Sequence, residues 1–332
     1  MRFRRSGRVL WLAVLAVVAG CGFLAFRLLA PYQGFAAPAF VEFPRGTSTG
    51  AMAAMLAKAG VVRSRWDFWL ARIVARNRVL EAGEYQFTRP ASPLAVVRRI
   101  ARGDIFYYTL MVPEGKNLFD IAAMVEALGL FPESRFLAAA RDPASIRDLD
   151  PEAPTLEGYL FPNTYRVSRR TTAESLCRMM TARFREVWGG LDTSAPVHET
   201  VTLASLVEKE GKLAEERPRI AAVFENRLRI GMKLDCDPTT IYAALLERHY
   251  RGTIYRSDLE SGNPYNTYRH AGLPPGPIAN PGLESIRAVL NPAKSAALYF
   301  VLQPDESGAH HFSNTIAEHE AATARYRHGR GK

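Results

Sequence analysis

The sequence has few cysteines and lacks the short motifs of common metal sites. Its 332 residues include three cysteines, Cys21, Cys177 and Cys236, and no Cys-x-x-Cys pair, so zinc-finger-type sites are excluded. Cys177 and Cys236 are the only two that could pair, because Cys21 lies in an apolar run, and the sequence does not decide whether they do. No His-Glu-x-x-His occurs, and the histidines near the end of the chain lack convincing ligand spacing, so we expect no metal.

Other catalytic signatures are also missing. There is no P-loop, no Gly-x-Gly-x-x-Gly fingerprint and no Gly-x-Ser-x-Gly elbow, so we expect neither a nucleotide site nor any other cofactor. Acidic residues are outnumbered, 33 against 43 basic ones, which gives a formal net charge of +10. Such a charge attracts anionic lipid or wall polymers, although a generally basic surface is the plainer interpretation. No nucleic-acid-binding motif is present, and we expect no nucleic-acid partner.

Arginines crowd the start of the chain, and an apolar run from Val9 to Leu29, broken by Arg27, follows them. A bilayer core needs about 20 helical residues, and this run has that length. Residues 1–30 therefore predict a cytoplasmic tip and an uncleaved single-span anchor, with everything after it outside the membrane. Two alternatives stay open, a cleaved signal peptide and a lipoprotein-type cleavage before Cys21, and both also imply export.

The exported part predicts an α+β protein in two blocks. Residues 31–39 form a Pro/Gly linker, and residues 40–112 predict a small module. Its pattern is strand (40–43), helix (50–59), helix (from Ser64) and strand (83–87), then a helix that begins at Ser92-Pro93. Residues 113–325 predict the larger domain, and residues 326–332 predict a tail. The larger domain is expected to have helices at 118–128, 132–140, 171–188, 201–211 and 218–230, one beginning at Asp237, and a hairpin at 298–312.

The helix that ends near Gly211 carries the best candidate for chemistry. Leu203, Leu206 and Val207 have helical spacing, and Glu210 is the next residue on that stripe. A carboxyl on an apolar face is partly desolvated, which raises its pKa, and the helix C-terminus disfavours its ionisation further. Glu210 could therefore act as a general acid. The alternative is a pair of solvated glutamates, Glu208 and Glu210, at a fraying helix end.

Three loop segments are rich in Pro, Gly, Asn and Tyr, at 155–165, 265–268 and 272–282. Stiff loops with aromatic and amide side chains suit a sugar-binding cleft, because aromatic faces cover pyranose rings and amides reach hydroxyls. The same residues are also ordinary turn formers.

Taken together, long motifs in one order resemble the YceG-like family of endolytic murein transglycosylases. The motifs are Leu-Glu-Gly-Tyr-Leu-Phe-Pro-Asn-Thr-Tyr from Leu156, Ala-Ser-Leu-Val-Glu-Lys-Glu from Ala204, Val-Phe-Glu-Asn-Arg-Leu-Arg-Ile-Gly-Met-Lys-Leu from Val223, Asp-Pro-Thr-Thr-Ile-Tyr from Asp237, Tyr-Asn-Thr-Tyr from Tyr265, Gly-Leu-Pro-Pro-Gly-Pro-Ile from Gly272, Asn-Pro-Gly from Asn280 and Tyr-Phe-Val from Tyr299. The likeness is strong over residues 150–320 and looser elsewhere. One departure is Gly211, where some members have threonine.

The resemblance implies a single-pass protein of the bacterial inner membrane, with a cytoplasmic N-terminus, a LysM-like module and a periplasmic catalytic domain. The module is expected either to bind glycan or to act as a spacer. The implied reaction cuts the β-1,4 bond between MurNAc and GlcNAc in nascent peptidoglycan strands and leaves 1,6-anhydro-MurNAc ends. Peptidoglycan synthases (penicillin-binding proteins) are implied partners. The second glutamate of the Glu-x-Glu motif, Glu210, is the implied catalytic residue. Expected substrate contacts are Glu157, Tyr165, Asn226, Asp237, Thr239, Tyr265, Asn266, Tyr268 and Asn280.

One carboxyl suffices for this reaction if the MurNAc 6-hydroxyl is the nucleophile, because that group is already held beside the bond. Two other functions remain open on the sequence. A muramidase-type hydrolase would need a second carboxylate, from Asp237 or Glu157. A non-catalytic glycan-binding scaffold for wall synthases would not need an acid at Glu210.

Overall fold

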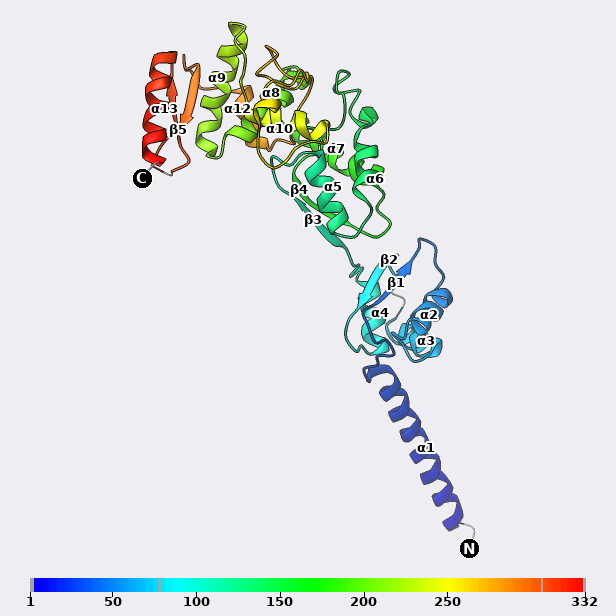
Figure 1. Cartoon of the computed structure of the whole chain (residues 1–332). Helices are drawn as coiled ribbons and strands as arrows, with labels where there is room; N and C mark the ends of the chain where they lie inside the picture. The colour runs from blue at the N-terminus through cyan, green and yellow to red at the C-terminus, as the bar shows by residue number, and fades with distance from the viewer. Residues whose placement is uncertain (1–2, 77–78, 306, 331–332) are drawn as a thin grey trace. The chain divides into compact units, whose positions relative to one another are not determined.

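The computed structural model describes residues 3–76, 79–305 and 307–330, and the chain forms two compact units, residues 1–108 and 109–332 (Figure 1). The predicted boundary lies at residue 112. The strand at this boundary, β3 (Tyr108–Val112), pairs with β4 (Asn163–Val167), so it belongs to the sheet of the second unit.

The first unit joins a long helix to a small module. Serines cap three of the module's helices, because the side chains of Ser48, Ser64 and Ser92 accept backbone N–H groups of the first turn. The caps at Ser64 and Ser92 were expected, and the one at Ser48 was not. The strands β1 and β2 pair antiparallel, with Ala39 opposite Phe87. The predicted strand–helix–helix–strand order is therefore found, whereas the likeness to LysM stays a prediction. The elements are α1 (Phe3–Leu29), β1 (Ala39–Phe43), α2 (Thr49–Lys58), α3 (Arg65–Val74), β2 (Gly83–Phe87) and α4 (Pro93–Ala101).

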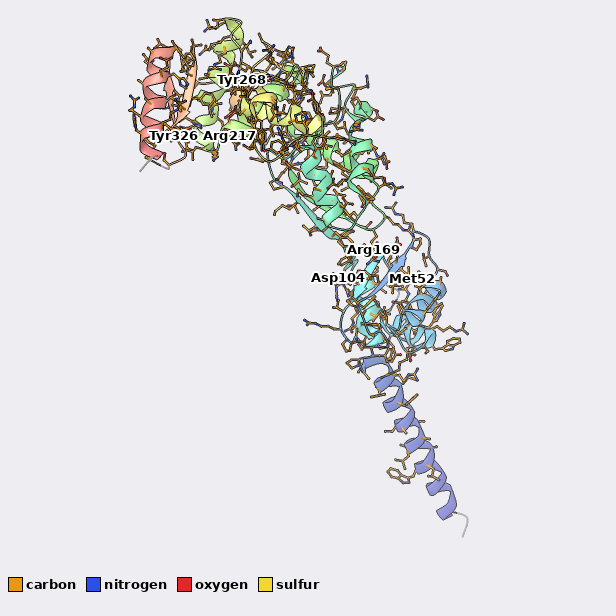
Figure 2. The ribbon with its side chains drawn as sticks, in the orientation of Figure 1. Met52, Asp104, Arg169, Arg217, Tyr268 and Tyr326 are labelled. Carbon is orange, nitrogen blue, oxygen red and sulfur yellow. The ribbon has the colours of Figure 1, made fainter. Side chains whose placement is uncertain are left out.

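The module has its own apolar core, to which the end of α1 belongs. Phe43, Leu56, Phe68 and Tyr85 are fully buried in it, and Leu28 of α1 is buried in the same cluster. Met52 of α2 lies in this core as well (Figure 2). Within α1, a 19-residue stretch from residue 11 to 29 is long and apolar enough to cross a membrane.

The second unit is mostly helical, with two small two-stranded sheets, β3–β4 and β5–β6. The predicted hairpin is confirmed, since Tyr299 pairs with Ser313 in antiparallel register. The elements are β3, α5 (Leu118–Ala127), α6 (Glu133–Ala140), the 3₁₀ turn Pro143–Ser145, β4, α7 (Ala173–Gly189), α8 (Val197–Glu210), the 3₁₀ turn Ala214–Glu216, α9 (Arg217–Arg229), α10 (Asp237–Leu246), α11 (Arg256–Leu259), α12 (Leu283–Leu290), β5 (Tyr299–Leu302), β6 (His310–Ser313) and α13 (Ile316–Arg330).

The helix α8 runs through the centre of this unit. Every residue from Thr200 to Val207 is buried, so α8 has no solvent-facing side over two turns. Helices α9, α10 and α12 pack against it. A helix enclosed in this way is held firmly, and its last residue, Glu210, is therefore placed by the whole core of the unit.

Several elements differ from expectation. The segment 163–167 was expected to be loop but forms β4, because it finds a partner in β3 across the chain. The expected tail at 326–332 is helical as far as Arg330, within α13. The helix that begins at Asp237 ends at Leu246, earlier than the predicted stop near Gly252.

The loop between α11 and α12 is held by a buried amide. The Nδ2 of Asn266 donates to the carbonyls of Asp258 (3.3 Å), Leu259 (3.1 Å) and Ser261 (2.7 Å). Its Oδ1 accepts the backbone N–H of Tyr268 at 3.1 Å. Asn266 is completely buried, so this loop depends on one side chain for the pairing of several backbone groups.

We expect Asn266→Ala to destabilise the second unit by about 2–4 kcal/mol, because it leaves buried backbone groups without partners. Thermal unfolding followed by circular dichroism should show a lower midpoint, by roughly 5–10 °C. The exposed Asn314 provides the matched control, and Asn314→Ala should leave the midpoint unchanged. Equal midpoints for the two variants would contradict the role given to Asn266.

Candidate active site

A cavity of about 380 Å³ opens where α8 ends. Its walls come from the C-terminus of α8, from α9, from the segment before α10, from β5 and from α13. The lining residues are Glu210, Phe224, Arg227, Leu234, Asp235, Cys236, Asp237, Tyr268, Tyr299, Phe300, Ile316 and His319. The cavity thus combines three carboxyls, those of Glu210, Asp235 and Asp237, with aromatic walls.

Glu210 is the last residue of α8 and only partly exposed. Burial is the main cause that raises the pKa of Glu210, and the nearby charge of Asp237 raises it further. The thiol of Cys236 and the positive charges of His310 and Lys209 act in the opposite direction but do not cancel the effect of burial. Glu210 therefore keeps its proton at a higher pH than an ordinary glutamic acid.

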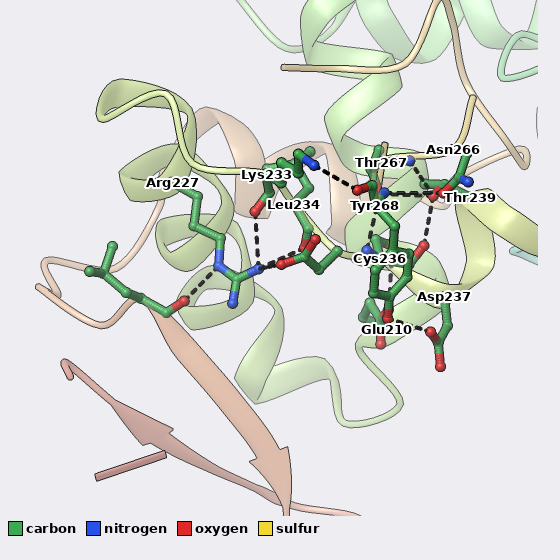
Figure 3. Close-up of polar contacts among 12 residues, drawn as sticks. Glu210, Arg227, Lys233, Leu234, Cys236, Asp237, Thr239, Asn266, Thr267 and Tyr268 are labelled. Carbon is green, nitrogen blue, oxygen red and sulfur yellow. Dashed lines mark hydrogen bonds and ion pairs between the residues drawn. The ribbon is translucent and has the colours of Figure 1, made fainter. Parts of the chain in front are cut away.

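The thiol of Cys236 lies beside this carboxyl. Its Sγ donates a hydrogen bond to Oε1 of Glu210 at 3.3 Å (Figure 3). Burial and the neighbouring Glu210 raise the pKa of Cys236 well above its usual range, so the thiol stays protonated and remains a donor. Cys236 and Cys177 are both buried free thiols. One oxygen of Glu210 is thus oriented by a neutral donor rather than by a cation.

Backbone contacts hold Cys236 in place. Its N–H donates to Oγ1 of Thr267 at 3.0 Å, and its carbonyl accepts from Oγ1 of Thr239 at 2.6 Å. The guanidinium of Arg227 donates to the carbonyls of Leu234 (2.8 Å) and Leu298 (2.6 Å), which ties α9 to the segment before Cys236 and to the start of β5 (Figure 3). The cavity wall around Glu210 is therefore built by many hydrogen bonds to backbone.

A second carboxylate, Asp237, faces the cavity at the first residue of α10. The hydroxyl of Tyr268 donates to its Oδ1 at 2.6 Å, and Nζ of Lys233 donates to the carbonyl of Tyr268 at 3.0 Å. Tyr268 lies close to Asp237 in Figure 3. The loop held by Asn266 thus delivers a hydroxyl to the carboxylate that stands next to Glu210.

The β5–β6 hairpin supplies the opposite wall. A buried pair anchors it, because the backbone N–H of His310 donates to Oε1 of Glu216 at 2.9 Å and its Nδ1 lies 2.7 Å from Oε2. On β5, the ring of Tyr299 stacks on His319 of α13 with centroids 5.1 Å apart. Flat aromatic surfaces next to a proton donor suit a ligand with both an apolar ring face and a basic or leaving oxygen.

Of the predicted site residues, Glu210, Asp237 and Tyr268 line this cavity. The other seven lie elsewhere in the part of the chain that the structure describes, and most of them hold loops. Tyr165 donates to the carbonyl of Phe161, Asn226 donates to the carbonyls of Ser295 and Ala297, and Thr239 donates to Cys236. Tyr265 packs on Tyr242, with ring centroids 5.1 Å apart. Contact of these residues with a substrate stays a prediction.

Glu157 and Asn280 form a buried cluster of their own. The carboxylate of Glu157, 1% exposed, accepts from the backbone N–H of Leu118 and from Nδ2 of Asn280, both at 2.9 Å. Burial raises the pKa of Glu157 to about 8. The Oδ1 of Asn280 accepts the N–H of Leu160 at 2.9 Å. This cluster ties three loops together, and the expected place of Glu157 beside the reacting sugar is not supported by its contacts.

Cys236, Arg227 and His319 are site residues that the sequence did not indicate. Cys236 stands next to the predicted Asp237, but a lone cysteine gives no local signal. Arg227 lies inside a quoted motif, and its position four residues before Gly231 fits an ordinary helix end. His319 was considered only as a metal ligand, and its part in the aromatic wall depends on α13, which was not predicted.

Comparisons with known proteins identify the family of this chain. The model of the YceG-like family matches residues 41–325. A Bacillus subtilis protein named endolytic murein transglycosylase is 33% identical over an alignment of 309 residues, and the match covers 86% of this chain and 84% of that protein. A Streptococcus pneumoniae protein of the same name is 32% identical over an alignment of 319 residues, and the match covers 86% of this chain but only 58% of that protein.

A solved structure points the same way. A YceG-like protein from Listeria monocytogenes has 31% sequence identity and a TM-score of 0.54, with 86% of this chain and 98% of that chain covered. The matched residues include all the elements around the cavity except the last turns of α13. On these grounds, the chain belongs to the YceG-like family.

Proposed function

We propose that this protein is a membrane-anchored endolytic murein transglycosylase that cuts peptidoglycan glycan strands, with Glu210 as its acid and base. The similar proteins from Bacillus subtilis and Streptococcus pneumoniae are both named endolytic murein transglycosylase. The observation that supports the role of Glu210 is its place: a carboxyl at the end of a buried helix, in a cavity, with a raised pKa and no arginine or lysine in hydrogen-bond contact among the described residues.

The proposed reaction needs one proton carrier. Glu210 protonates O4 of the leaving GlcNAc as the C1–O4 bond breaks, and the 6-hydroxyl of the same MurNAc attacks C1. The proton of that hydroxyl passes to Glu210, which restores the acid, and the product is 1,6-anhydro-MurNAc. No water is consumed. Because the nucleophile belongs to the substrate, a second catalytic carboxylate is not required.

The neighbours of Glu210 have distinct proposed roles. Cys236 orients the carboxyl, and Asp237 with Tyr268 stabilises positive charge that develops at C1 in the transition state. Asp237 is also the second carboxylate that a muramidase-type hydrolase would use, so product analysis has to separate the two reactions.

The anchor helix and the basic N-terminal arginines support an inner-membrane location, with the N-terminus in the cytoplasm and the second unit in the periplasm. Glycan strands are the proposed substrate there. Penicillin-binding proteins, which are peptidoglycan synthases, are the partners we propose.

Glu210→Gln should abolish glycan cleavage, by at least about 10³-fold in kcat, because an amide cannot deliver the proton. Mass spectrometry of digested strands measures both rate and product ends. The parent enzyme should give anhydro ends, one water lighter than reducing ends. The matched control is Glu199→Gln, an exposed glutamate on the same helix, which should retain full activity. Reducing MurNAc ends would favour the hydrolase, and full cellular function of Glu210→Gln would favour a scaffold.

Stability should depend on pH through the same group. The folded-state pKa of Glu210 is raised, so the folded state binds more protons than the unfolded state above about pH 4.5, and stability falls as pH rises through this window. Glu210→Gln removes this loss. We expect the thermal midpoint of the variant to exceed that of the parent at about pH 8, but not at about pH 4. If the midpoints of Glu210→Gln and the parent differed by the same amount at every pH, the desolvation assigned to Glu210 would be contradicted.

Variants of Cys236 should move the pH profile in opposite directions. The alkaline limb of kcat/KM reports deprotonation of Glu210 in the free enzyme. Cys236→Ala removes a donor that favours the carboxylate, so this limb should move to higher pH. Cys236→Ser supplies a stronger donor, so the limb should move to lower pH. Cys177→Ala, at a buried thiol in α7 outside the cavity, is the control. If the alkaline limb moved in the same direction in both Cys236 variants, the hydrogen bond from Cys236 to Glu210 would be refuted.

A further inference from the structure

One face of helix α3 carries apolar side chains and is not covered by the rest of the module. Asp67, Phe68 and Ala71 are buried against the core, whereas Trp66 is 66% exposed and Ile73 69% exposed. Trp69 and Val74 extend the same face and are exposed as well. Two tryptophans and two aliphatic residues on a ten-residue helix make a concentrated apolar surface, and such surfaces mark interaction sites.

The position of α3 relative to the anchor is fixed by contacts. The guanidinium of Arg27 pairs with the carboxylate of Asp67, with Nη2 2.6 Å from Oδ1. Arg63, directly before α3, lies over the rings of Phe26 (5.7 Å) and Tyr32 (5.1 Å). With Leu28 buried in the core of the module, the last turn of α1 and the first turn of α3 form one packed junction.

The length of the anchor places this junction at the edge of a bilayer. A helix of 19 residues is about 28 Å long, close to the ~30 Å of a hydrocarbon core. The whole apolar stretch is needed to cross, so its final turn, with Arg27, reaches the headgroup region. The first turn of α3 is joined to that final turn by the ion pair between Arg27 and Asp67. The exposed tryptophans of α3 therefore lie next to the interface between membrane and water.

The charges beside the apolar face have the matching sign. Arg65 and Arg76 are exposed at the two ends of α3, and Arg65 lies over the ring of Trp66 at 5.0 Å. Arginine side chains are attracted to anionic lipid headgroups, and tryptophan is enriched at membrane interfaces. An amphipathic helix with an apolar face and a basic edge is the usual form of an interfacial helix.

We infer that the exposed face of α3, formed by Trp66, Trp69, Ile73 and Val74, docks on the surface of the membrane that α1 crosses, with anionic phospholipid headgroups as its ligand. The module is then a second membrane contact beyond the transmembrane helix. A glycan-binding role for this face is the competing assignment, and the experiment below separates the two.

Tryptophan fluorescence of the full chain tests the docking. The chain has four tryptophans, so a Trp11→Phe, Trp188→Phe variant reports only on Trp66 and Trp69. It is reconstituted in vesicles of phosphatidylethanolamine and phosphatidylglycerol whose acyl chains carry bromine near the headgroup. We expect roughly twofold quenching relative to unbrominated vesicles, because docked indoles enter the headgroup and upper acyl region. The same indoles should be shielded from aqueous iodide.

A second variant controls for insertion of the anchor. Trp66→Phe, Trp69→Phe, Trp188→Phe leaves Trp11, inside the apolar helix, and its quenching by the brominated lipids shows that α1 is in the bilayer. If Trp11 is quenched while Trp66 and Trp69 are not, and iodide reaches them freely, the docking is refuted although the anchor is in place. Protection from iodide by added glycan strands, without lipid quenching, would assign the face to glycan and also overturn the inference.

Discussion

The desolvation of one carboxyl, at the end of a helix that is buried on every side, is the constraint on which this structure depends. A charged glutamate in such a place is unfavourable unless a cation or several donors compensate it. The neighbours of Glu210 supply a thiol at 3.3 Å, a weak donor that stays protonated. The pKa of Glu210 is therefore raised, so this side chain holds its proton to a higher pH than an ordinary glutamic acid does.

The rest of the second unit maintains this arrangement. The guanidinium of Arg227 donates hydrogen bonds to backbone carbonyls of two neighbouring segments. The side-chain amide of Asn266 donates to backbone carbonyls next to the loop that carries Tyr268. Each of these side chains is buried, so its hydrogen bonds are not exchanged with water. The walls of the cavity are thus irregular backbone made rigid by side chains, rather than helices or strands that would be rigid without help.

Local signals were sufficient for much of the fold. The caps at Ser64 and Ser92 and the turn between β5 and β6 were predicted because their signals lie within a few residues. β4 could not be predicted, since a short polar strand such as Asn163–Val167 depends on its pairing with β3. The site shows the same division. Glu210 was predicted from its place on an apolar stripe. Asn280 was predicted as a ligand-binding amide, and its Oδ1 accepts the N–H of Leu160, so it holds loop backbone, while its contact with a substrate stays a prediction. The sequence cannot distinguish these two uses of an asparagine, because both place the amide in a Pro/Gly-rich loop.

The Glu-Lys-Glu motif at the end of α8 shows how spacing on a helix assigns different chemistry to identical residues. Two positions apart, the glutamates point about 200° away from each other around the helix. Glu208 lies 3.1 Å from the guanidinium of Arg217 and accepts from Oγ of Ser285 at 2.7 Å, so its charge is compensated. Glu210 faces the cavity and has no such cation in contact.

Gly211 completes this arrangement at the end of α8. A Cβ at position 211 would lie 2.8 Å from Cγ of Arg217 and 2.9 Å from the carbonyl oxygen of Val207. Arg217 must pass close to the helix end to reach Glu208, so residue 211 has to be small. A larger side chain at this position would have to displace Arg217. Here the glycine leaves room for Arg217 to pair with Glu208, while Cys236 supplies the donor to Glu210, so two carboxyls two residues apart have different partners.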